Sequence, residues 1–173
     1  MIDLLDAIEW NAATRPTKTA FVSEEERFTF SAFAEAVART AAGFRDQEIR
    51  PGDHVVIACH HSDAVVVPSY ALLWLGAIPI LANASLLDDL AAIVRPTDAM
   101  VLVYGPQVRP LLSGGPPPGV QLLVAADGPD GRGVPLTALA QSTPIPAERD
   151  RLQRGHNRPP KAAPPYGRGR PLG

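Results

Sequence analysis

The chain has 173 residues, of which 46% are apolar and 20% charged, enough for one globular domain with a buried core. Its single cysteine, Cys59, excludes an internal disulfide, and no spacing of cysteine and histidine fits a zinc site. The chain is therefore not one of the small proteins that are held together by disulfides or by a structural metal ion. The formal net charge of −2 combines −8 over residues 1–148 with +6 over residues 149–173, so the chain has two compositions.

The chain begins with the pattern of a short helix and a hairpin. Residues 2–11 carry leucine and isoleucine on one helical side and predict an amphipathic helix that Arg15-Pro16 ends. Residues 19–22 and 27–30 predict two short strands on either side of an acidic turn. The acidic start is unlike a signal peptide, and with the single cysteine it leads us to expect a cytoplasmic protein.

The clearest helix follows this hairpin. Apolar residues recur at helical spacing from Phe33 to Phe44, and Ser31 or Thr29 can cap the helix. Arg50-Pro51-Gly52-Asp53 has the composition of a turn, and residues 54–59 predict a buried strand after it.

Residues 64–87 form an uncharged run of 24 residues, long enough for a transmembrane helix. Pro68, Gly76 and Pro79 argue against a membrane span. We expect instead a helix over residues 62–75 and a short apolar strand over residues 78–81, as in a parallel sheet covered on both faces.

The remaining pattern alternates helices with strands. It predicts a helix over residues 86–94 closed by Arg95-Pro96, a strand over 99–104, a short helix over 108–112, a strand over 120–126, and loops over 113–119 and 127–133. Alternating elements of this kind predict an α/β fold with a largely parallel sheet and flanking helices.

Four segments in order carry a family resemblance: residues 15–22 (Arg-Pro-Thr-Lys-Thr-Ala-Phe-Val), 28–30 (Phe-Thr-Phe), 50–56 (Arg-Pro-Gly-Asp-His-Val-Val) and 71–80 (Ala-Leu-Leu-Trp-Leu-Gly-Ala-Ile-Pro-Ile). Together they resemble the N-terminal lobe of the adenylate-forming (AMP-binding) enzymes, the acyl-CoA synthetases and aryl-acid-AMP ligases. The resemblance implies a ligase that uses ATP and Mg²⁺ to activate a carboxylic acid as an acyl-adenylate. The acyl group then passes to the thiol of coenzyme A or of a carrier protein.

The chain also departs from this family. Glu48 stands where the family often has glycine, and residues 60–63 (His-His-Ser-Asp) replace an Asn-Ser-Pro-Glu-like helix start. The family's phosphate loop, a later acidic residue and the lysine of its C-terminal domain are not found in residues 1–148. We therefore expect residues 1–142 to form a partial, truncated N-terminal lobe, inactive alone, and we assign the chain no catalytic, cofactor-binding or metal-binding residue.

Residues 143–173 form a Pro/Gly/Arg-rich segment with few aliphatic residues, typical of a disordered tail. A sharper hypothesis is a frameshift. Reading residues 153–166 from the second base of each codon can give Ser-Gly-Gly-Thr-Thr-Gly-Arg-Pro-Lys-Leu-Leu-Pro-Arg-Thr, which resembles the family's phosphate loop. That form is most similar to the aryl-acid ligases that load 2,3-dihydroxybenzoate or salicylate in siderophore pathways.

Individual reactive residues favour structural roles. We expect Cys59 to be a buried small hydrophobe, His60-His61 a strand-end turn and Ser62-Asp63 a helix start. The glycine-rich segments over residues 114–115 and 128–133 lack phosphate-loop spacing, and Lys161 lacks a catalytic context.

Two other function classes stay open. One is a stand-alone, non-catalytic α/β binding or interaction module that folds through about residue 142. The other uses the basic tail to bind nucleic acid or a membrane, but Tyr166 is the tail's only aromatic residue. We expect no nucleic-acid and no membrane partner.

Overall fold

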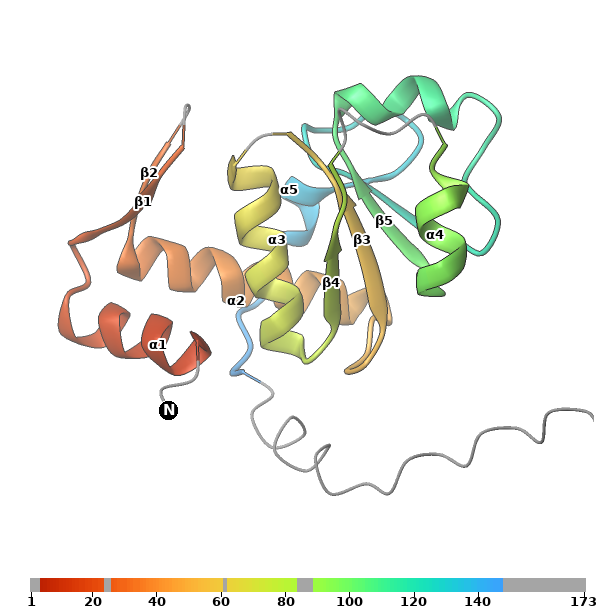
Figure 1. Cartoon of the computed structure of the whole chain (residues 1–173). Helices are drawn as coiled ribbons and strands as arrows, with labels where there is room; N and C mark the ends of the chain where they lie inside the picture. The colour runs from red at the N-terminus through yellow and green to blue at the C-terminus, as the bar shows by residue number, and fades with distance from the viewer. Residues whose placement is uncertain (1–3, 24–25, 61, 84–88, 148–173) are drawn as a thin grey trace, which may run out of the picture.

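The computed structural model describes residues 4–23, 26–60, 62–83 and 89–147 of the chain. Two parts are visible in Figure 1: a parallel sheet with helices on both faces, and a helix with a hairpin beside it, joined by the long helix α2. Residues 148–173 of the predicted tail, which include the shifted-frame loop and Lys161, lie outside the described residues.

The described elements run in this order: α1 (Leu4–Thr14), β1 (Thr19–Val22), β2 (Arg27–Thr29), α2 (Phe30–Asp46), β3 (His54–Ala58), α3 (Ser62–Leu75), β4 (Ile78–Leu81), α4 (Ala91–Thr97), β5 (Val101–Tyr104), the 3₁₀ helix η2 (Pro106–Leu112), β6 (Leu122–Ala125), β7 (Val134–Pro135) and α5 (Leu136–Leu139). Strands β1 and β2 pair antiparallel. The other five strands form one parallel sheet in the order β4-β3-β5-β6-β7.

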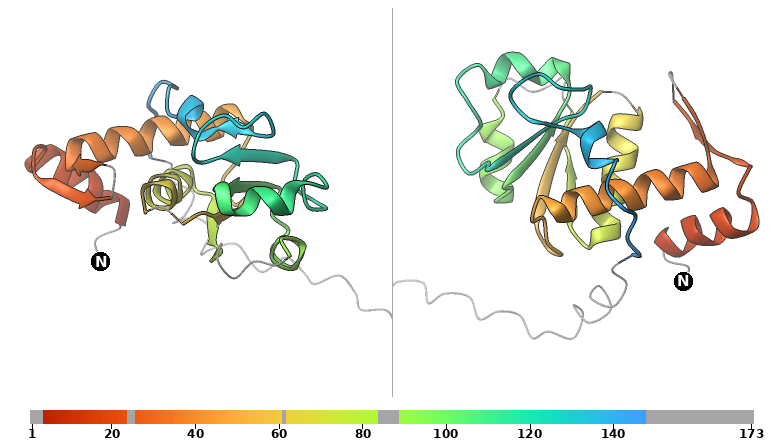
Figure 2. Two further views of the ribbon diagram at one scale, coloured as in Figure 1. Left: turned by 90° about the horizontal axis from the view of Figure 1, so that it is seen from above. Right: turned by 180° about the vertical axis from the view of Figure 1, so that it is seen from behind.

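The parallel sheet is buried on both faces. Val55 and Ile57 of β3 belong to the core cluster that includes side chains of α2 and α3, whereas Val56 belongs to the cluster beneath α4 and η2. Both views in Figure 2 show the sheet between these helices. Because both faces exclude water, the strands need apolar residues at every position, which explains their unbroken apolar runs.

The predicted α/β class and the largely parallel sheet are confirmed, as are the helix over residues 62–75 and the strand over residues 78–81. In the part of the chain that the structure describes, no helix has the length and apolarity needed to cross a membrane. Residues 143–147, which the sequence analysis places in the tail, include Ile145, whose carbonyl accepts a 2.8 Å hydrogen bond from the Trp74 indole.

Several predicted boundaries were wrong. The helix expected to close at Arg95-Pro96 instead begins at Ala91 and runs to Thr97. It continues past Pro96 because this proline lies in the last turn, where the helix loses only one backbone N–H donor. Asp98, with φ of 50°, then ends the helix in the left-handed region. The strands expected over 99–104 and 120–126 have only four residues each, and β7 and α5 were not predicted.

Hydrogen bonds cap helix α2 at both ends. Thr29, rather than Ser31, is the N-cap, and its hydroxyl accepts a bond from the Ala32 N–H at 3.2 Å. At the other end the Ile49 N–H donates to the Phe44 carbonyl at 3.1 Å, and the Glu48 N–H donates to the Arg45 carbonyl at 2.8 Å. This is the Schellman pattern, in which glycine is the usual residue at the Glu48 position.

Glu48 has φ of 65°, a left-handed conformation that costs most non-glycine residues free energy. We expect Glu48→Gly to relieve that strain and to raise the free energy of unfolding by up to about 1 kcal/mol, less the extra entropy of glycine in the unfolded chain. Urea denaturation followed by circular dichroism measures the change. Glu48→Ala removes the charge but keeps the strain, so an equal gain in that variant would contradict this explanation.

Candidate functional site

The carboxyl ends of the parallel strands meet at one edge of the sheet. Helix α3, which connects β3 to β4, lies on one face of the sheet, and helix α4, which connects β4 to β5, lies on the other. Strands β3 and β5 are neighbours in the sheet, and the connections that follow them diverge at this point. In open α/β sheets, ligands bind outside the carboxyl ends of the strands at such a switch point. This edge is therefore the candidate functional site.

The two strand ends at the switch point approach each other closely. The Gly105 N–H donates to the Ala58 carbonyl at 3.0 Å. A Cβ at Gly105 would lie 2.9 Å from Oε1 of Gln107 and 3.6 Å from Cα of Cys59, so a larger residue would displace the Gln107 side chain. Cys59 is buried, as predicted.

The residues after β3 were predicted to form a strand-end turn and a helix start. His60 is exposed directly after β3, and His61 lies outside the described residues. Helix α3 begins at Ser62, as predicted for Ser62-Asp63. Over the described ranges, no group of three or more histidine, cysteine, aspartate or glutamate side chains could hold a metal ion.

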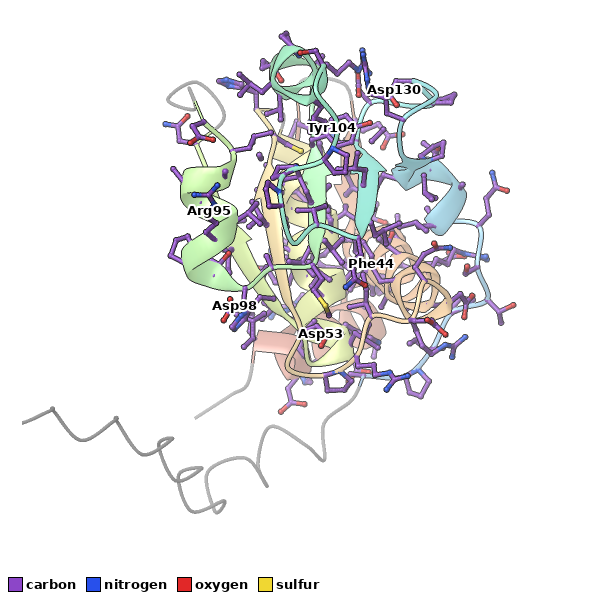
Figure 3. All side chains as sticks on the ribbon, turned by 90° about the vertical axis from the view of Figure 1, so that its right-hand side faces the viewer. Phe44, Asp53, Arg95, Asp98, Tyr104 and Asp130 are labelled. Carbon is purple, nitrogen blue, oxygen red and sulfur yellow. The ribbon has the colours of Figure 1, made fainter. Side chains whose placement is uncertain are left out.

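Four polar side chains do converge at the edge, and we call them the Tyr104 cluster: Tyr104, Arg109, Asp127 and Asp130. Tyr104 is fully buried at the end of β5, and its hydroxyl donates to Asp130 at 2.7 Å. Arg109, from η2, donates through Nε to Asp130 at 3.1 Å and pairs with Asp127. Figure 3 shows Tyr104 and Asp130 together at one end of the sheet, away from Asp53 at the other.

Hydrogen bonds set the protonation states in this cluster, whose one cation, Arg109, pairs with two carboxylates. Burial alone would raise the pKa of Asp130, but the N–H groups of Arg132 and Gly133, the Tyr104 hydroxyl and the Arg109 guanidinium lower it to about 2. Burial and the bond to this carboxylate raise the pKa of Tyr104 well above its ordinary value. We therefore expect neither Tyr104 nor Asp130 to change protonation near neutral pH.

The Tyr104 cluster instead braces the loop after β6 against β5 and η2. A Cβ at Gly133 would lie 2.7 Å from the Leu123 carbonyl and 3.1 Å from the Tyr104 hydroxyl, so this loop passes directly over the buried tyrosine. Residues 127–133, predicted to be a loop, contain both carboxylates of the cluster. Carboxylates that directly follow a buried parallel strand are the signal that could have found the cluster.

A hollow lies at the opposite edge of the sheet, where the strands begin. It has a volume of about 470 Å³ and is lined by Glu48, Arg50, Asp53, Met100 and Gln121, among others. Asp53 closes the predicted turn by accepting a 2.8 Å bond from the Arg50 N–H. Since ligands of parallel sheets bind at the carboxyl ends, this hollow is not our candidate site.

Comparison with known proteins identifies relatives of this fold. The sequence model of the family described as AMP-binding enzyme matches residues 8–164. Pyochelin synthase PchD of Pseudomonas aeruginosa is 31% identical over 77 residues, which are 44% of this chain and 14% of PchD.

Two solved structures are also similar. A provisionally assigned long-chain-fatty-acid CoA ligase from Rhodopseudomonas palustris CGA009 superposes with a TM-score of 0.73 and 29% identity, over 82% of this chain and 37% of that one. The anthranilate CoA ligase AuaEII, solved with anthranoyl-AMP, has a TM-score of 0.74 and 24% identity over 83% of this chain and 29% of its own, a likeness of fold alone. This chain thus spans well under half the length of each of these relatives.

Removing the Tyr104 hydroxyl tests whether the Tyr104 cluster stabilises the fold. We expect Tyr104→Phe to lower the free energy of unfolding by about 1.5–3 kcal/mol, because a buried hydrogen bond to a charged acceptor is lost. Urea denaturation at neutral pH measures the change. Tyr70→Phe is the matched control, since the Tyr70 hydroxyl makes no hydrogen bond within the described part of the chain, and an equal loss in both variants would argue against the brace.

Acid should weaken the stabilisation that the Asp130 carboxylate contributes to the Tyr104 cluster. The pKa of Asp130 is lower in the folded protein than its ordinary 3.8, so its contribution to stability is complete above about pH 4 and is lost as the pH falls toward 2. We expect the difference in free energy of unfolding between the native chain and Asp130→Asn to shrink between pH 6 and pH 3. A difference that stays constant over this range would show that Asp130 does not titrate as we infer.

Proposed function

This chain belongs to the AMP-binding enzyme family, and we propose that it is the N-terminal part of an ATP-dependent ligase that converts a carboxylic acid into an acyl-adenylate and then into a thioester. One observation carries the proposal: the described fold superposes on a CoA ligase over 82% of this chain at 29% identity. The acid, and the coenzyme A or carrier-protein thiol that receives it, belong to the proposal for the whole ligase.

We propose further that this chain does not catalyse the reaction alone. Phosphate groups need a cradle of backbone N–H groups and hydroxyls, or free cationic side chains. At the carboxyl edge, Arg109 is already paired with Asp127 and Asp130, and these carboxylates are engaged with donors of the protein. The described residues at this edge therefore do not fit ATP phosphates with Mg²⁺.

The proposed reason for the missing loop is a change of reading frame near residues 145–153. The shifted frame of residues 153–166 can encode a loop rich in glycine and threonine, the composition that cradles phosphate. Its similarity to aryl-acid ligases makes an aryl acid the narrower substrate proposal. The cytoplasm is the proposed location, because a single cysteine cannot form an internal disulfide and is typical of a reducing compartment.

Pyrophosphate exchange into ATP tests the proposal. We expect none from the 173-residue chain with salicylate, 2,3-dihydroxybenzoate or a long-chain fatty acid. A frame-restored chain, encoded after the shift is reversed upstream of codon 153, should exchange with at least one of them. Acid-dependent exchange by the 173-residue chain itself would contradict the proposed inactivity.

The coding DNA from about codon 140 onward supplies the control. If the shifted frame encodes the glycine and threonine loop and stays open for several hundred codons, the ligase proposal stands. A shifted frame that closes soon after the loop would refute the frameshift. The stand-alone binding module would then be favoured.

A further inference from the structure

The residues after α5 cross the outer side of the layer formed by α2 and α3. Residues 142–147 have the sequence Ser-Thr-Pro-Ile-Pro-Ala, and we call them the Pro-Ile-Pro strap. The right-hand view of Figure 2 shows this segment, in blue, running from α5 across α2. The side chains of Ile145 and Ala147 pack against the core cluster, whereas residues 143, 144 and 146 are exposed.

A buried indole holds the centre of the strap. Trp74 of α3 is only 4% exposed, and its Nε1–H donates to the Ile145 carbonyl at 2.8 Å. The indole has a single donor, and a buried donor without a partner is costly, so this bond fixes where the strap lies. At the start of the strap, Arg39 donates to the Ser142 carbonyl at 3.4 Å, a longer and weaker hydrogen bond.

Two prolines prepare the strap for the contact with Trp74. Proline fixes its own φ, and the residue before a proline is held in the extended region of backbone conformation. Ile145 lies between Pro144 and Pro146, so little conformational entropy is lost when its carbonyl meets the indole. Aromatic side chains recognise proline-rich peptides for the same reason, because such peptides are already extended before they bind.

The strap is attached less firmly than the elements before it. In the part of the chain that the structure describes, its carbonyls accept hydrogen bonds from Trp74 and Arg39 alone, and it joins neither sheet. Helix α5 is held more closely, since a Cβ at Gly43 of α2 would lie 2.6 Å from Cα of Leu139. Segments with few buried contacts open at a lower free energy than the whole fold. The strap can therefore detach while α5 and the sheet stay folded.

We propose that the surface around Trp74 is a docking site for an extended Pro-x-Pro segment, and that residues 144–146 of the same chain occupy it as a latch. The Trp74 indole supplies the hydrogen-bond donor, and apolar side chains of α2 and α3 supply the packing surface. Because the strap is tethered through α5, it reaches the site at a high effective concentration and excludes other peptides while the latch is closed. The inference goes beyond the proposed ligase function and does not depend on it.

Fluorescence quenching tests the latch. Trp10→Phe leaves Trp74 as the only tryptophan of the 173-residue chain, and acrylamide then reports the exposure of this indole. In that background we expect Ile145→Asp to raise the quenching constant severalfold with the far-UV circular dichroism unchanged, because a carboxylate is costly against the apolar layer. Thr143→Asp is the matched control, since it adds the same charge at an exposed position of the strap and should leave quenching unchanged.

A peptide with the sequence of residues 141–147 tests the docking site directly. Added in excess to the Ile145→Asp chain, it should restore the protection of Trp74. The same peptide with alanine in place of both prolines should need a higher concentration, because it has more conformational entropy to lose. Failure of the proline-containing peptide to protect Trp74, or equal potency of the two peptides, would overturn the docking site.

Hydrogen exchange of the Trp74 indole N–H in the unmodified chain provides a second test of the latch. We expect it to exchange faster than the slowest amides of β3 and β5 and to respond less steeply to low concentrations of urea, as local opening does. Exchange at the same rate and with the same urea dependence as those amides would show that the strap opens only when the whole chain unfolds. That result, or equal quenching of Trp74 in Ile145→Asp and Thr143→Asp, would refute the latch.

Discussion

Burial of the parallel sheet on both faces is the constraint on which the rest of this structure depends. Strands β3 and β5 alternate their side chains between two apolar cores, one beneath α2 and α3 and the other beneath α4 and η2. Polar groups are costly at either face, because buried donors and acceptors need partners. The chemistry of the fold is therefore confined to the ends of the strands and to the loops that follow them.

Tyr104 shows how a polar group is accommodated at the end of a strand that is buried on both faces. Its ring fills the core while its hydroxyl reaches the carboxyl edge, where Asp130 accepts the hydrogen bond. That carboxylate in turn needs donors, which the Arg109 side chain and the following backbone supply. The resulting cluster pairs the Arg109 charge within the chain and holds the loop after β6 against the end of β5.

Helix α1 and the β1–β2 hairpin differ from the parallel sheet, whose two faces are covered by helices of the same chain. Its aromatic rings are ordered by mutual packing, yet Leu4 and Val22 remain half exposed or more. The parallel sheet buries its apolar strands within the chain, whereas the hairpin has one partner strand and one covered side within the described residues.

Local patterns were enough to predict the elements whose boundaries are set by neighbouring residues. The helix over residues 62–75 and the strand over 78–81 followed from an apolar run divided by Gly76, and the ordered motifs predicted the family. Sequence reasoning missed the Tyr104 cluster, because Tyr104 and Asp130 are 26 residues apart and only strand pairing brings them together. It also placed helix α4 wrongly, since one lost hydrogen bond at Pro96 matters less than packing of the helix on the sheet. Composition and periodicity thus determined the fold class, whereas long-range packing decided which polar groups meet and which apolar face is left open.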